Sequence, residues 1–363
     1  MSNNHIKYLS KKKVRSMSNK CDYLMLLGER SGGKSYAVKS LCIEDAYKNH
    51  KLFIYLKRYD LEVKDSLCVS YFADMPVQEM TNGEYSCIDV FRKGIYLANT
   101  DPETGKVTRG QKIGICHALS GAEHYKSLAF PDVDAIIYEE FISMNGQYIY
   151  NETDALQQYV SSIYRNNRKG KVFLVGNTIS RICPYYSDWN LETTKMKPGD
   201  TKSFTQENEN GPDTVITVYI TPSLNTNTGM FFGRASKNIT QGAYATTPQP
   251  RLPDNIRNYN IIYRVVLHHD NLMFLMQLLQ HKEESDQITW YVCPKTTKIE
   301  KGTRVVSTKF STDPYHTMLL EGITKQEQEI FKMLLAGRVC FCDDLTGTEF
   351  YNLLPKFRRA NAR

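Results

Sequence analysis

The residues with the clearest chemistry lie near the start of the chain, where residues 28–35 read GERSGGKS. This spacing matches the GxxxxGK[ST] pattern of loops that bind phosphate between a strand and a helix. Glycines allow the turns that aim backbone N–H groups at a phosphate, and the helix that follows adds its N-terminal dipole. Lys34 would reach the β- and γ-phosphate oxygens, and the Ser35 hydroxyl would be a ligand for Mg²⁺. The loop therefore predicts a site for ATP with Mg²⁺.

Two acidic residues end a second apolar segment, residues 134–140, which reads DAIIYEE. Ligands bind at the carboxyl ends of the strands in open α/β sheets, so this end is expected to face the loop. We expect Glu139 to lie on the Mg²⁺ side of the site and Glu140 to be the general base that activates water. An aspartate is usual at the first position, so the longer Glu139 leaves direct and water-mediated coordination both open.

Two further polar residues flank the next strand. Asn177 follows residues 171–176 (KVFLVG), where its amide could position the attacking water or sense the γ-phosphate. Arg165 precedes that strand, and its guanidinium could stabilise charge on the γ-phosphate of a neighbouring subunit. Residues 19–22 match the guanine-reading pattern NKxD, but they precede the loop instead of following it, and we assign this match to chance.

The composition is that of a folded, water-soluble chain. Its 363 residues are 41% hydrophobic and 23% charged, enough for a core and about the length of two domains. No run of 18 apolar residues occurs, so no membrane span is expected. The nine cysteines include no CxxC pair, which argues for buried thiols in a reducing compartment and against a zinc ribbon.

The net charge of +7 permits binding to a polyanion without requiring it. Basic residues are concentrated at the two ends of the chain. Residues 1–20 hold six Lys or Arg residues and no acid, and four more fall within the last eight residues. We interpret both ends as basic tails.

The apolar pattern predicts alternating strands and helices. Continuous apolar runs predict buried strands at residues 23–27, 52–56, 133–138, 171–176 and 215–221, with helices from Lys34 to about Tyr47 and over 152–168. Residues 94–117 are expected to form a hairpin around the turn TDPETGK. Because continuous rather than alternating apolar runs are typical of strands covered on both faces, we predict an α/β fold with a mainly parallel central sheet.

The pattern changes after residue 222. Residues 223–258 are rich in Asn, Thr, Gly and Pro, and we interpret them as a linker between residues 1–222, a P-loop ATPase domain with a basic N-terminal tail, and a smaller domain at 259–363. The second domain contains apolar runs at 261–267, 271–279 and 288–292, a helical stretch at 324–335, the segment RVCFC and a terminal helix.

Taken together, these motifs resemble a known family. LLGERSGGKSYAVK, FIYLKRY, KSLAFPDVDAIIYEEFI, SIYRNNRKGKVFLVGNTIS and CPYY are similar, in order and spacing, to segments of the DNA-encapsidation ATPases of phi-29-like phages. That family belongs to the additional-strand P-loop ATPases, which include FtsK/HerA-type translocases. The resemblance covers about residues 20–190 and is weaker over 259–363.

The resemblance implies roles for individual residues. Arg165 would be an arginine finger acting in trans, Lys126 a basic residue near the subunit interface, and Lys57 and Arg58 a basic pair after the second strand. The nucleotide-binding set would comprise Gly28, Arg30, Ser31, Gly32, Gly33, Lys34, Ser35, Tyr36 and Lys126, with Ser35 and Glu139 at the metal and Lys34, Glu140, Arg165 and Asn177 in catalysis.

The resemblance also implies an assembly and a location. The family forms a ring, implied to be pentameric, on the phage portal and drives double-stranded DNA into a prohead in the host cytoplasm. A scaffold RNA is a further partner that the resemblance leaves open, and no membrane is involved. The C-terminal domain would have an RNase H-like α/β fold that has lost its nuclease metal site.

Three other functions stay open at this point. Asp270, Asp343 and Asp344 could be the remnant of a two-metal nuclease or simple turn residues, and an active nuclease would make the chain terminase-like. A cellular nucleic-acid translocase or helicase would share the same ATPase site. A P-loop phosphotransferase would need an arginine-rich lid and an acceptor pocket, and it seldom carries paired glutamates.

Overall fold

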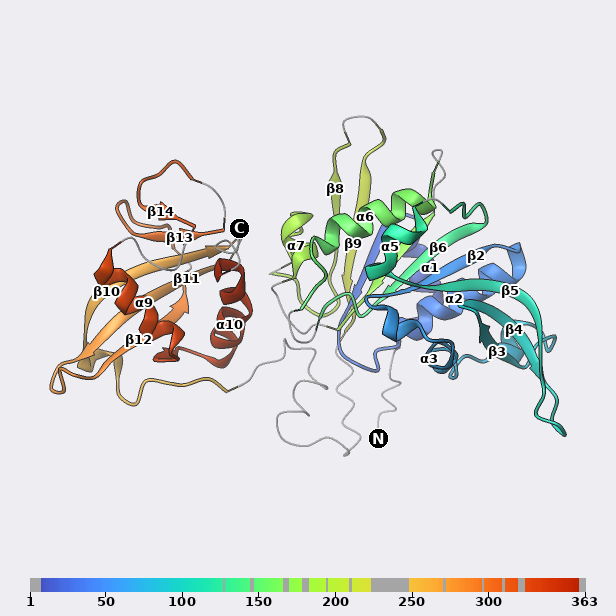
Figure 1. Ribbon diagram of the computed structural model, residues 1–363, viewed down its shortest axis with the longest axis horizontal. Helices are drawn as coiled ribbons and strands as arrows, with labels where there is room; N and C mark the ends of the chain where they lie inside the picture. The colour runs from blue at the N-terminus through green and yellow to red at the C-terminus, as the bar shows by residue number, and fades with distance from the viewer. Residues whose placement is uncertain are drawn as a thin grey trace. The chain divides into compact units, whose positions relative to one another are not determined.

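The computed structural model describes residues 8–126, 128–143, 147–165, 170–177, 183–193, 195–208, 211–222, 248–269, 272–295, 297–308, 311–318 and 324–358. These residues form two compact units. The first contains strands β1 to β9 and helices α1 to α7, and the second contains strands β10 to β15 with helices α9 and α10 (Figure 1). Within the described ranges, no helix combines the length and the apolar composition that a membrane span needs.

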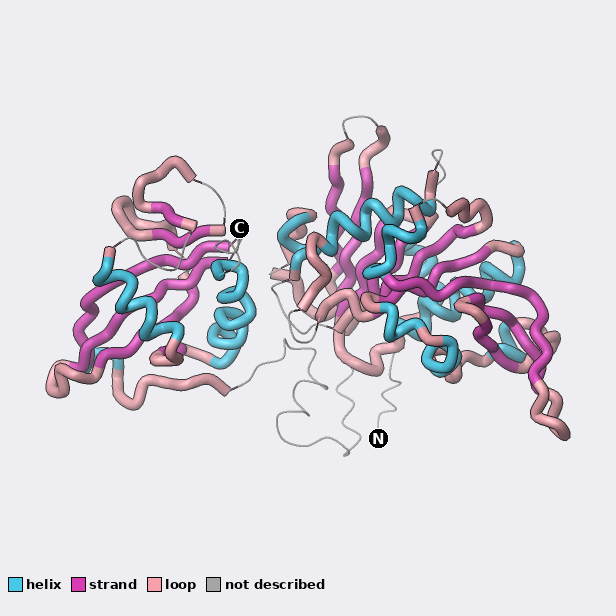
Figure 2. The backbone as a smooth tube through the Cα atoms, in the orientation of Figure 1, coloured by secondary structure: helices cyan, strands magenta, loops and turns pink. Residues whose placement is uncertain are grey.

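A nine-stranded sheet is the central layer of the first unit, in the order β3-β4-β5-β2-β6-β7-β1-β9-β8 among the described residues (Figure 2). All neighbours from β5 to β9 are parallel, and β3, β4 and β8 add antiparallel edges. This confirms the predicted α/β fold with a mainly parallel sheet. The strands are β1 (Tyr23–Leu27), β2 (Leu52–Lys57), β3 (Cys87–Phe91), β4 (Gly94–Thr100), β5 (Val107–Ala118), β6 (Val133–Glu139), β7 (Lys171–Val175), β8 (Thr201–Gln206) and β9 (Thr214–Ile220).

Both faces of the parallel strands are buried, as the continuous apolar runs require. Leu24 and Leu26 of β1 pack in one core with Val38 of α2, while Met25, which points to the opposite face, is also fully buried. The helices are α1 (Lys11–Ser18), α2 (Lys34–Asn49), α3 (Asp65–Ser70), α4 (Val77–Met80), α5 (Ala122–Tyr125), α6 (Glu152–Ile163) and α7 (Pro184–Asp188), with 3₁₀ turns η1 (Asp60–Val63) and η2 (Leu119–Gly121).

The interpretation of residues 1–20 as a basic tail is wrong for the part that the structure describes. Residues 11–18 form α1, whose Val14 is fully buried in the main core. Two of its four basic side chains pair with acids of α2, Lys11 with Glu44 and Arg15 with Asp45. The positive charges of this segment therefore attach a helix to the domain.

The other predicted elements of the first unit differ in detail from the structure. The expected hairpin within 94–117 is present as β4 and β5. The helix predicted over 152–168 ends at Ile163, since the next residue, Tyr164, leaves the helical conformation at φ −100° and ψ 51°. Residues 166–169 of that prediction lie outside the described residues. β8 was not predicted, since its exposed sequence TKSFTQ has no apolar face of its own.

The second unit is a sheet with helices packed against one core. Its strand order among the described residues is β14-β13-β10-β11-β12-β15, with an antiparallel meander of β10, β11 and β12 and parallel strands on either side. Phe331 of α9 and Phe350 of α10 pack into the same core as Trp290 of β12. The elements are η3 (Ile256–Asn258), β10 (Tyr259–His269), β11 (Leu272–His281), β12 (Ile288–Pro294), β13 (Val305–Ser307), β14 (His316–Thr317), α9 (Lys325–Leu335), β15 (Val339–Phe341) and α10 (Asp344–Arg358).

Part of the predicted linker packs into the second unit. Residues 223–247 lie outside the described residues, whereas the Pro250 carbonyl accepts a hydrogen bond from the Phe341 N–H at 2.8 Å. Arg251 pairs with Asp344 at 3.1 Å. Residues 248–258 are therefore an arm of the second unit, attached to β15 and to the start of α10.

Two of the three candidate nuclease acids are described, and both accept hydrogen bonds from backbone amides of the second unit. Asp343 accepts the Thr346 N–H at 2.6 Å, and Asp344 accepts the Gln249 N–H at 3.1 Å. Asp270 lies outside the described residues. In the part of the chain that is described, no group of three or more His, Cys, Asp or Glu residues is arranged to hold a metal ion.

Candidate functional site: the loop after β1 and the acids after β6

The loop that follows β1 requires glycine at its first position. Gly28 has φ +141°, and a side chain there would place its Cβ 1.9 Å from the Thr221 hydroxyl oxygen. Gly33 has φ +77°, and a Cβ there would come within 3.2 Å of the Tyr8 side chain. Gly28 therefore excludes a side chain by space, and at Gly33 the positive φ and the nearby Tyr8 side chain both disfavour one.

The loop leads directly into a helix that is open to an anion. Gly33 is the N-cap of α2 and brings no side-chain oxygen to the first amides of the helix. Ser31 adopts φ +61°, a left-handed conformation that is uncommon for a residue with a side chain. Unsatisfied amides and the helix dipole together favour negative charge at this point.

Lys34 is buried and bonded within its own loop. Its ammonium donates to the carbonyls of Gly28, at 3.1 Å, and Glu29, and to Asn177 Oδ1 at 3.4 Å. Burial lowers the pKa of Lys34 to about 8, although the negative charges of Glu29 and Glu139 oppose the shift. The structure thus holds a cation at the loop whose charge water stabilises poorly.

Glu139 ends β6 and is bonded to the neighbouring strand. The Tyr55 hydroxyl of β2 donates a hydrogen bond to Glu139 Oε2. Burial, and then the charge of Glu139, raise the pKa of Tyr55 well above its usual range, so this phenol stays protonated. Tyr55 therefore fixes one carboxylate oxygen and leaves the other for a further ligand.

Glu140 has a strained backbone and a paired side chain. It adopts φ +57°, and its N–H donates to the Val175 carbonyl of β7 at 2.8 Å. Lys57, 5% exposed at the end of β2, donates to Glu140 Oε2 at 3.1 Å. Burial lowers the pKa of Lys57, but Glu140 and Glu139 outweigh burial and the net shift is upward, so Lys57 is charged.

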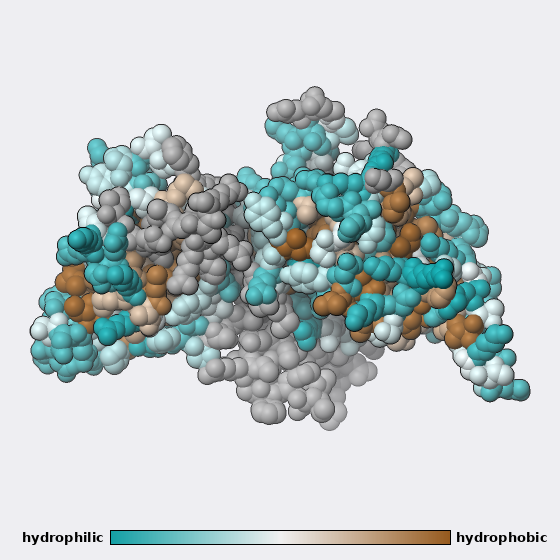
Figure 3. Space-filling view, viewed as in Figure 1, coloured by the Kyte–Doolittle hydropathy of each residue, from teal (hydrophilic) through white to brown (hydrophobic). Residues whose placement is uncertain are grey.

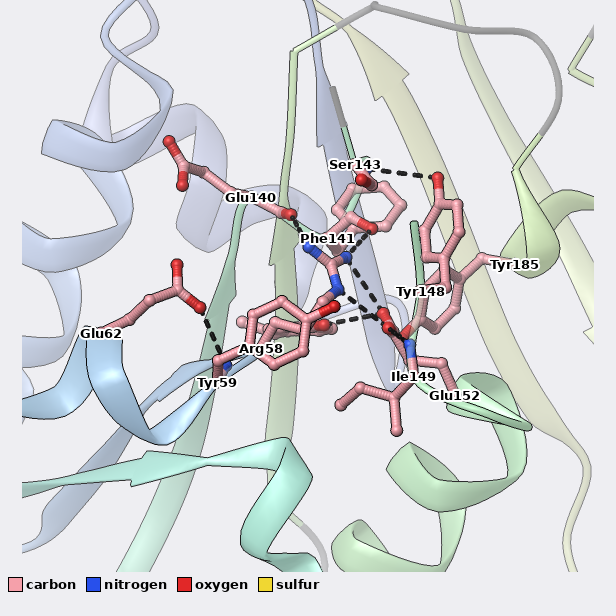
Figure 4. A network of polar contacts seen from close by, with 11 residues as sticks. Arg58, Tyr59, Glu62, Glu140, Phe141, Ser143, Tyr148, Ile149, Glu152 and Tyr185 are labelled. Carbon is pink, nitrogen blue, oxygen red and sulfur yellow. Dashed lines mark hydrogen bonds and ion pairs between the residues drawn. The ribbon is translucent and has the colours of Figure 1, made fainter. Parts of the chain in front are cut away.

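A buried ion pair holds the backbone that follows β6 (Figure 4). Arg58 donates to both carboxylate oxygens of Glu152, at 2.8 and 3.0 Å, and also to the carbonyls of Glu140 and Phe141. The Glu152 side chain is fully buried. It accepts further hydrogen bonds from the hydroxyls of Tyr138 and Tyr185 and from the Ile149 N–H.

This network keeps an otherwise unfavourable conformation in place. A left-handed residue with a side chain persists where its surroundings over-determine it. The Glu140 carbonyl is held by Arg58, while the Glu140 carboxylate points away from Arg58 (Figure 4). The ion pair thus positions the Glu140 side chain without touching it.

One cavity of about 1230 Å³ is lined by the phosphate-binding loop together with Glu139 and Glu140. It lies along the carboxyl edge of the sheet, between the loop, the ends of β6 and β7, and the segment that leads into α4. Of the residues predicted for the site, Arg30, Ser31, Gly32, Gly33, Lys34, Ser35, Tyr36, Glu139, Glu140 and Asn177 line it. Ser35 and Glu139 bring two oxygen donors of the kind that Mg²⁺ prefers to this one cavity.

Gly28, at the start of the loop, is not among the lining residues, and two further predicted residues lie elsewhere. Lys126 caps the end of α5, pairs with Glu123 at 2.6 Å and does not line the cavity. Arg165 is exposed just before β7, at the amino edge of the parallel strands, and so at the opposite edge from the loop. Neither lines the cavity of its own chain.

The sequence left several cavity residues unidentified. Tyr8, Leu9 and Lys11 line the cavity from the N-terminal segment, and the Leu9 N–H donates to the Gly32 carbonyl at 3.1 Å. Glu79 and Met80 line it from α4. No local motif marks these residues, since they reach the site through packing of the chain.

Comparison with known proteins places the chain beside phage packaging proteins. The family model of the podovirus DNA encapsidation protein (Gp16) matches residues 5–198, more than half of the chain. The DNA packaging protein of Bacillus phage B103 is 34% identical over 174 residues, 46% of this chain and 47% of that protein. The DNA packaging protein of Bacillus phage phi29 is 31% identical over 168 residues, 46% of each. The match thus spans about half the length of these curated relatives.

Solved structures extend the likeness in fold over the whole chain. A chain of the bacteriophage Phi-29 viral genome packaging motor assembly aligns with 97% of this chain and 99% of its own, at a TM-score of 0.57 and 19% identity. A chain of the Phi-28 gp11 DNA packaging motor aligns with 96% and 98%, at a TM-score of 0.50 and 16% identity. At these identities the likeness shows a shared fold.

The lowered pKa of Lys34 predicts a pH-dependent affinity for triphosphates. The charged form binds phosphate, so the affinity for ATP should be nearly constant from pH 6 to 7.5. Above the pKa of about 8 it should fall, approaching a tenfold loss per pH unit. Titration calorimetry between pH 6.5 and 9.5 measures this, and the binding should also take up protons above pH 8. A flat profile to pH 9.5 would contradict a Lys34 pKa near 8.

The Arg58–Glu152 pair predicts a large effect of neutralising one partner. Glu152→Gln leaves the Arg58 charge buried without compensation, so the unfolding free energy of the first unit should fall by roughly 3–5 kcal/mol. The matched control is Glu123→Gln, which removes the same charge from an exposed pair and should change stability by less than about 1 kcal/mol. Urea unfolding measures both, and equal effects would refute the buried pair as a structural determinant.

Proposed function

Since the chain belongs to the podovirus DNA encapsidation protein (Gp16) family, we propose that it is an ATPase motor that drives double-stranded DNA into a phage prohead. The observation that supports this most strongly is that one cavity is lined both by the phosphate-binding loop and by the two glutamates at the end of β6, Glu139 and Glu140. A loop without the acids could bind a nucleotide, but the acids next to the loop add the groups that hydrolysis needs.

In the proposed reaction, the α2 amides and Lys34 hold the phosphates of ATP. Lys34 would exchange the carbonyls of Gly28 and Glu29 for phosphate oxygens. The Ser35 hydroxyl and Glu139 would hold Mg²⁺, which neutralises charge on the phosphates when bound. Tyr55 would keep the Glu139 carboxylate in place.

Glu140 would then act as the general base. Its carboxylate is 63% exposed and bonded to Lys57, so it must exchange this partner for the attacking water. Asn177 lines the same cavity beside Lys34, where its amide would orient that water or contact the γ-phosphate.

The proposed motor is a ring. Arg165 lies at the far edge of the sheet from its own cavity, a position from which it would serve a neighbouring subunit. Lys126, half-buried at the end of α5, would belong to the same interface. The ring is proposed to be pentameric and to act on the portal of a prohead in the host cytoplasm, with the contribution of a scaffold RNA left open. Contacts to DNA phosphates suit such a motor, because packaging must accept every sequence.

Glu140→Gln tests the proposed chemistry. The amide keeps the shape of the side chain but cannot accept a proton, so ATP should bind as before while hydrolysis falls by 100-fold or more. Phosphate release and ATP binding are measured on the same preparation. The control is Glu283→Gln, an exposed change in the second unit that should leave both unchanged. Wild-type turnover in Glu140→Gln would exclude Glu140 as the base.

Mixed subunits test the shared site. Lys34→Ala removes the loop cation and Arg165→Ala removes the proposed trans residue, so each variant alone should be inactive. In a mixture, some interfaces join an intact loop to an intact Arg165, and part of the ATPase activity should return. If every mixing ratio stays inactive although the two variants assemble together, Arg165 does not act across the interface.

A further inference from the structure

A basic hairpin tip joins β3 to β4 and adopts an unusual conformation. Arg92 and Lys93 are consecutive and both have positive φ, at 49° and 63°. Two-residue turns of this kind favour Asn-Gly or Gly-Gly, because side chains disfavour the left-handed region. Arg and Lys are disfavoured in this left-handed backbone conformation. Their presence in the turn therefore indicates a role for the two charged side chains.

An acidic residue of the neighbouring helix holds this tip. Asp65 of α3 accepts the Arg92 N–H at 2.7 Å with one oxygen and the Lys93 N–H at 2.9 Å with the other. The Lys93 ammonium bonds to Asp60 of η1 at 3.2 Å. Asp65 therefore fixes the turn through its backbone amides, while the Arg92 side chain is exposed.

The sheet face beside this tip carries aromatic and basic side chains. The Phe91 ring is 42% exposed, and the guanidinium groups of Arg92 and Arg109 lie over it at 5.2 and 4.3 Å from its centroid. Lys112 is exposed on β5, opposite Tyr96 of β4. In the space-filling view, apolar and hydrophilic residues alternate over the end of the first unit where these strands lie (Figure 3).

The unneutralised charge on this surface is positive. Asp89 pairs with Arg109 at 2.5 Å and Asp60 with Lys93, whereas Arg92 and Lys112 form no ion pair among the described residues. Two guanidinium groups already lie over the Phe91 ring. The ring therefore orients these groups and is not free to stack on a base. Oriented guanidinium groups match phosphate oxygens in particular.

We propose that this surface, formed by Phe91, Arg92, Lys93, Arg109 and Lys112, contacts the phosphate backbone of double-stranded DNA. The inference rests on the proposed function and names residues for its DNA contact. A backbone contact needs fixed cations with no base-specific groups, which is what the tip offers.

The surface is also joined to the catalytic side of the domain. Asp60, the partner of Lys93, follows Lys57 and Arg58 by three and two residues along the chain, and those residues hold the Glu140 side chain and backbone. A phosphate at Lys93 would compete with Asp60 for the ammonium. DNA bound at the tip would thus act next to the segment that positions the proposed base.

The test compares two double variants by fluorescence anisotropy on a labelled duplex of about 30 base pairs. Arg92→Gln with Lys112→Gln neutralises two exposed cations of the surface. Lys20→Gln with Lys48→Gln neutralises two exposed cations at the opposite edge of the sheet and is the matched control. Each lost phosphate contact lowers the salt slope by about 0.9, so the surface variant should lose about 1.8 in slope and the control nothing. Because the slope of the surface variant is shallower, the ratio of its affinity to that of the wild type should rise about 12-fold from 50 to 200 mM salt.

A second variant separates a positioned surface from diffuse attraction. Asp65→Ala removes a negative charge but frees the turn. General electrostatics predicts tighter binding to the duplex, whereas a preorganised tip predicts weaker binding. Tighter binding by Asp65→Ala would overturn the proposal.

Other outcomes separate failure of this inference from failure of the proposed function. If Arg92→Gln with Lys112→Gln binds the DNA duplex with wild-type affinity and slope, or weakens only a duplex RNA of the same length, the surface does not contact DNA. A wild-type chain that neither binds the duplex nor hydrolyses ATP in its presence would instead refute the proposed function. Wild-type binding and hydrolysis with an unaffected surface variant would refute this inference alone.

Discussion

The candidate site depends on one buried ion pair, between Arg58 at the end of β2 and Glu152 at the start of α6. Two opposite charges in a protein interior are stable when each has its full set of hydrogen bonds, and Glu152 has donors from Arg58, two tyrosines and a backbone amide. The same guanidinium holds the Glu140 and Phe141 carbonyls, which fixes the left-handed turn after β6. The orientation of the Glu140 carboxylate is therefore a consequence of charges buried behind it.

The opposite wall of the cavity is fixed by space instead of charge. Gly28 lies so close to Thr221 that no side chain fits there, and at Gly33 the positive φ and the nearby Tyr8 disfavour one. Each wall holds a buried lysine that is bonded to protein oxygens: Lys34 to loop carbonyls and Lys57 to Glu140. The proposed triphosphate would replace the carbonyl partners of Lys34, and the proposed attacking water would replace Lys57 as the partner of Glu140.

Much of this arrangement was accessible from the sequence, and the reasons for the rest are physical. The loop, the paired acids and the parallel strands are local patterns, and the predicted family and α/β fold are both confirmed. The Arg58–Glu152 pair joins residues 94 positions apart, so no local spacing indicates it. The basic residues of α1 suggested a tail because their partners, Glu44 and Asp45, lie on another helix. The exposed strand β8 was missed because its pairing with β9 supplies the order that its composition does not.

The central claim is that a triphosphate binds at the loop and faces the acids of β6. The most direct measurement is a structure of the full chain with Mg²⁺ and a non-hydrolysable ATP analogue. The account predicts the phosphates at the first amides of α2, with Lys34 moved from the carbonyls of Gly28 and Glu29 to the phosphate oxygens and with Glu139 on the metal side. A nucleotide bound elsewhere, or one at the loop with both glutamates still bonded to Tyr55 and Lys57 and remote from the γ-phosphate, would contradict it.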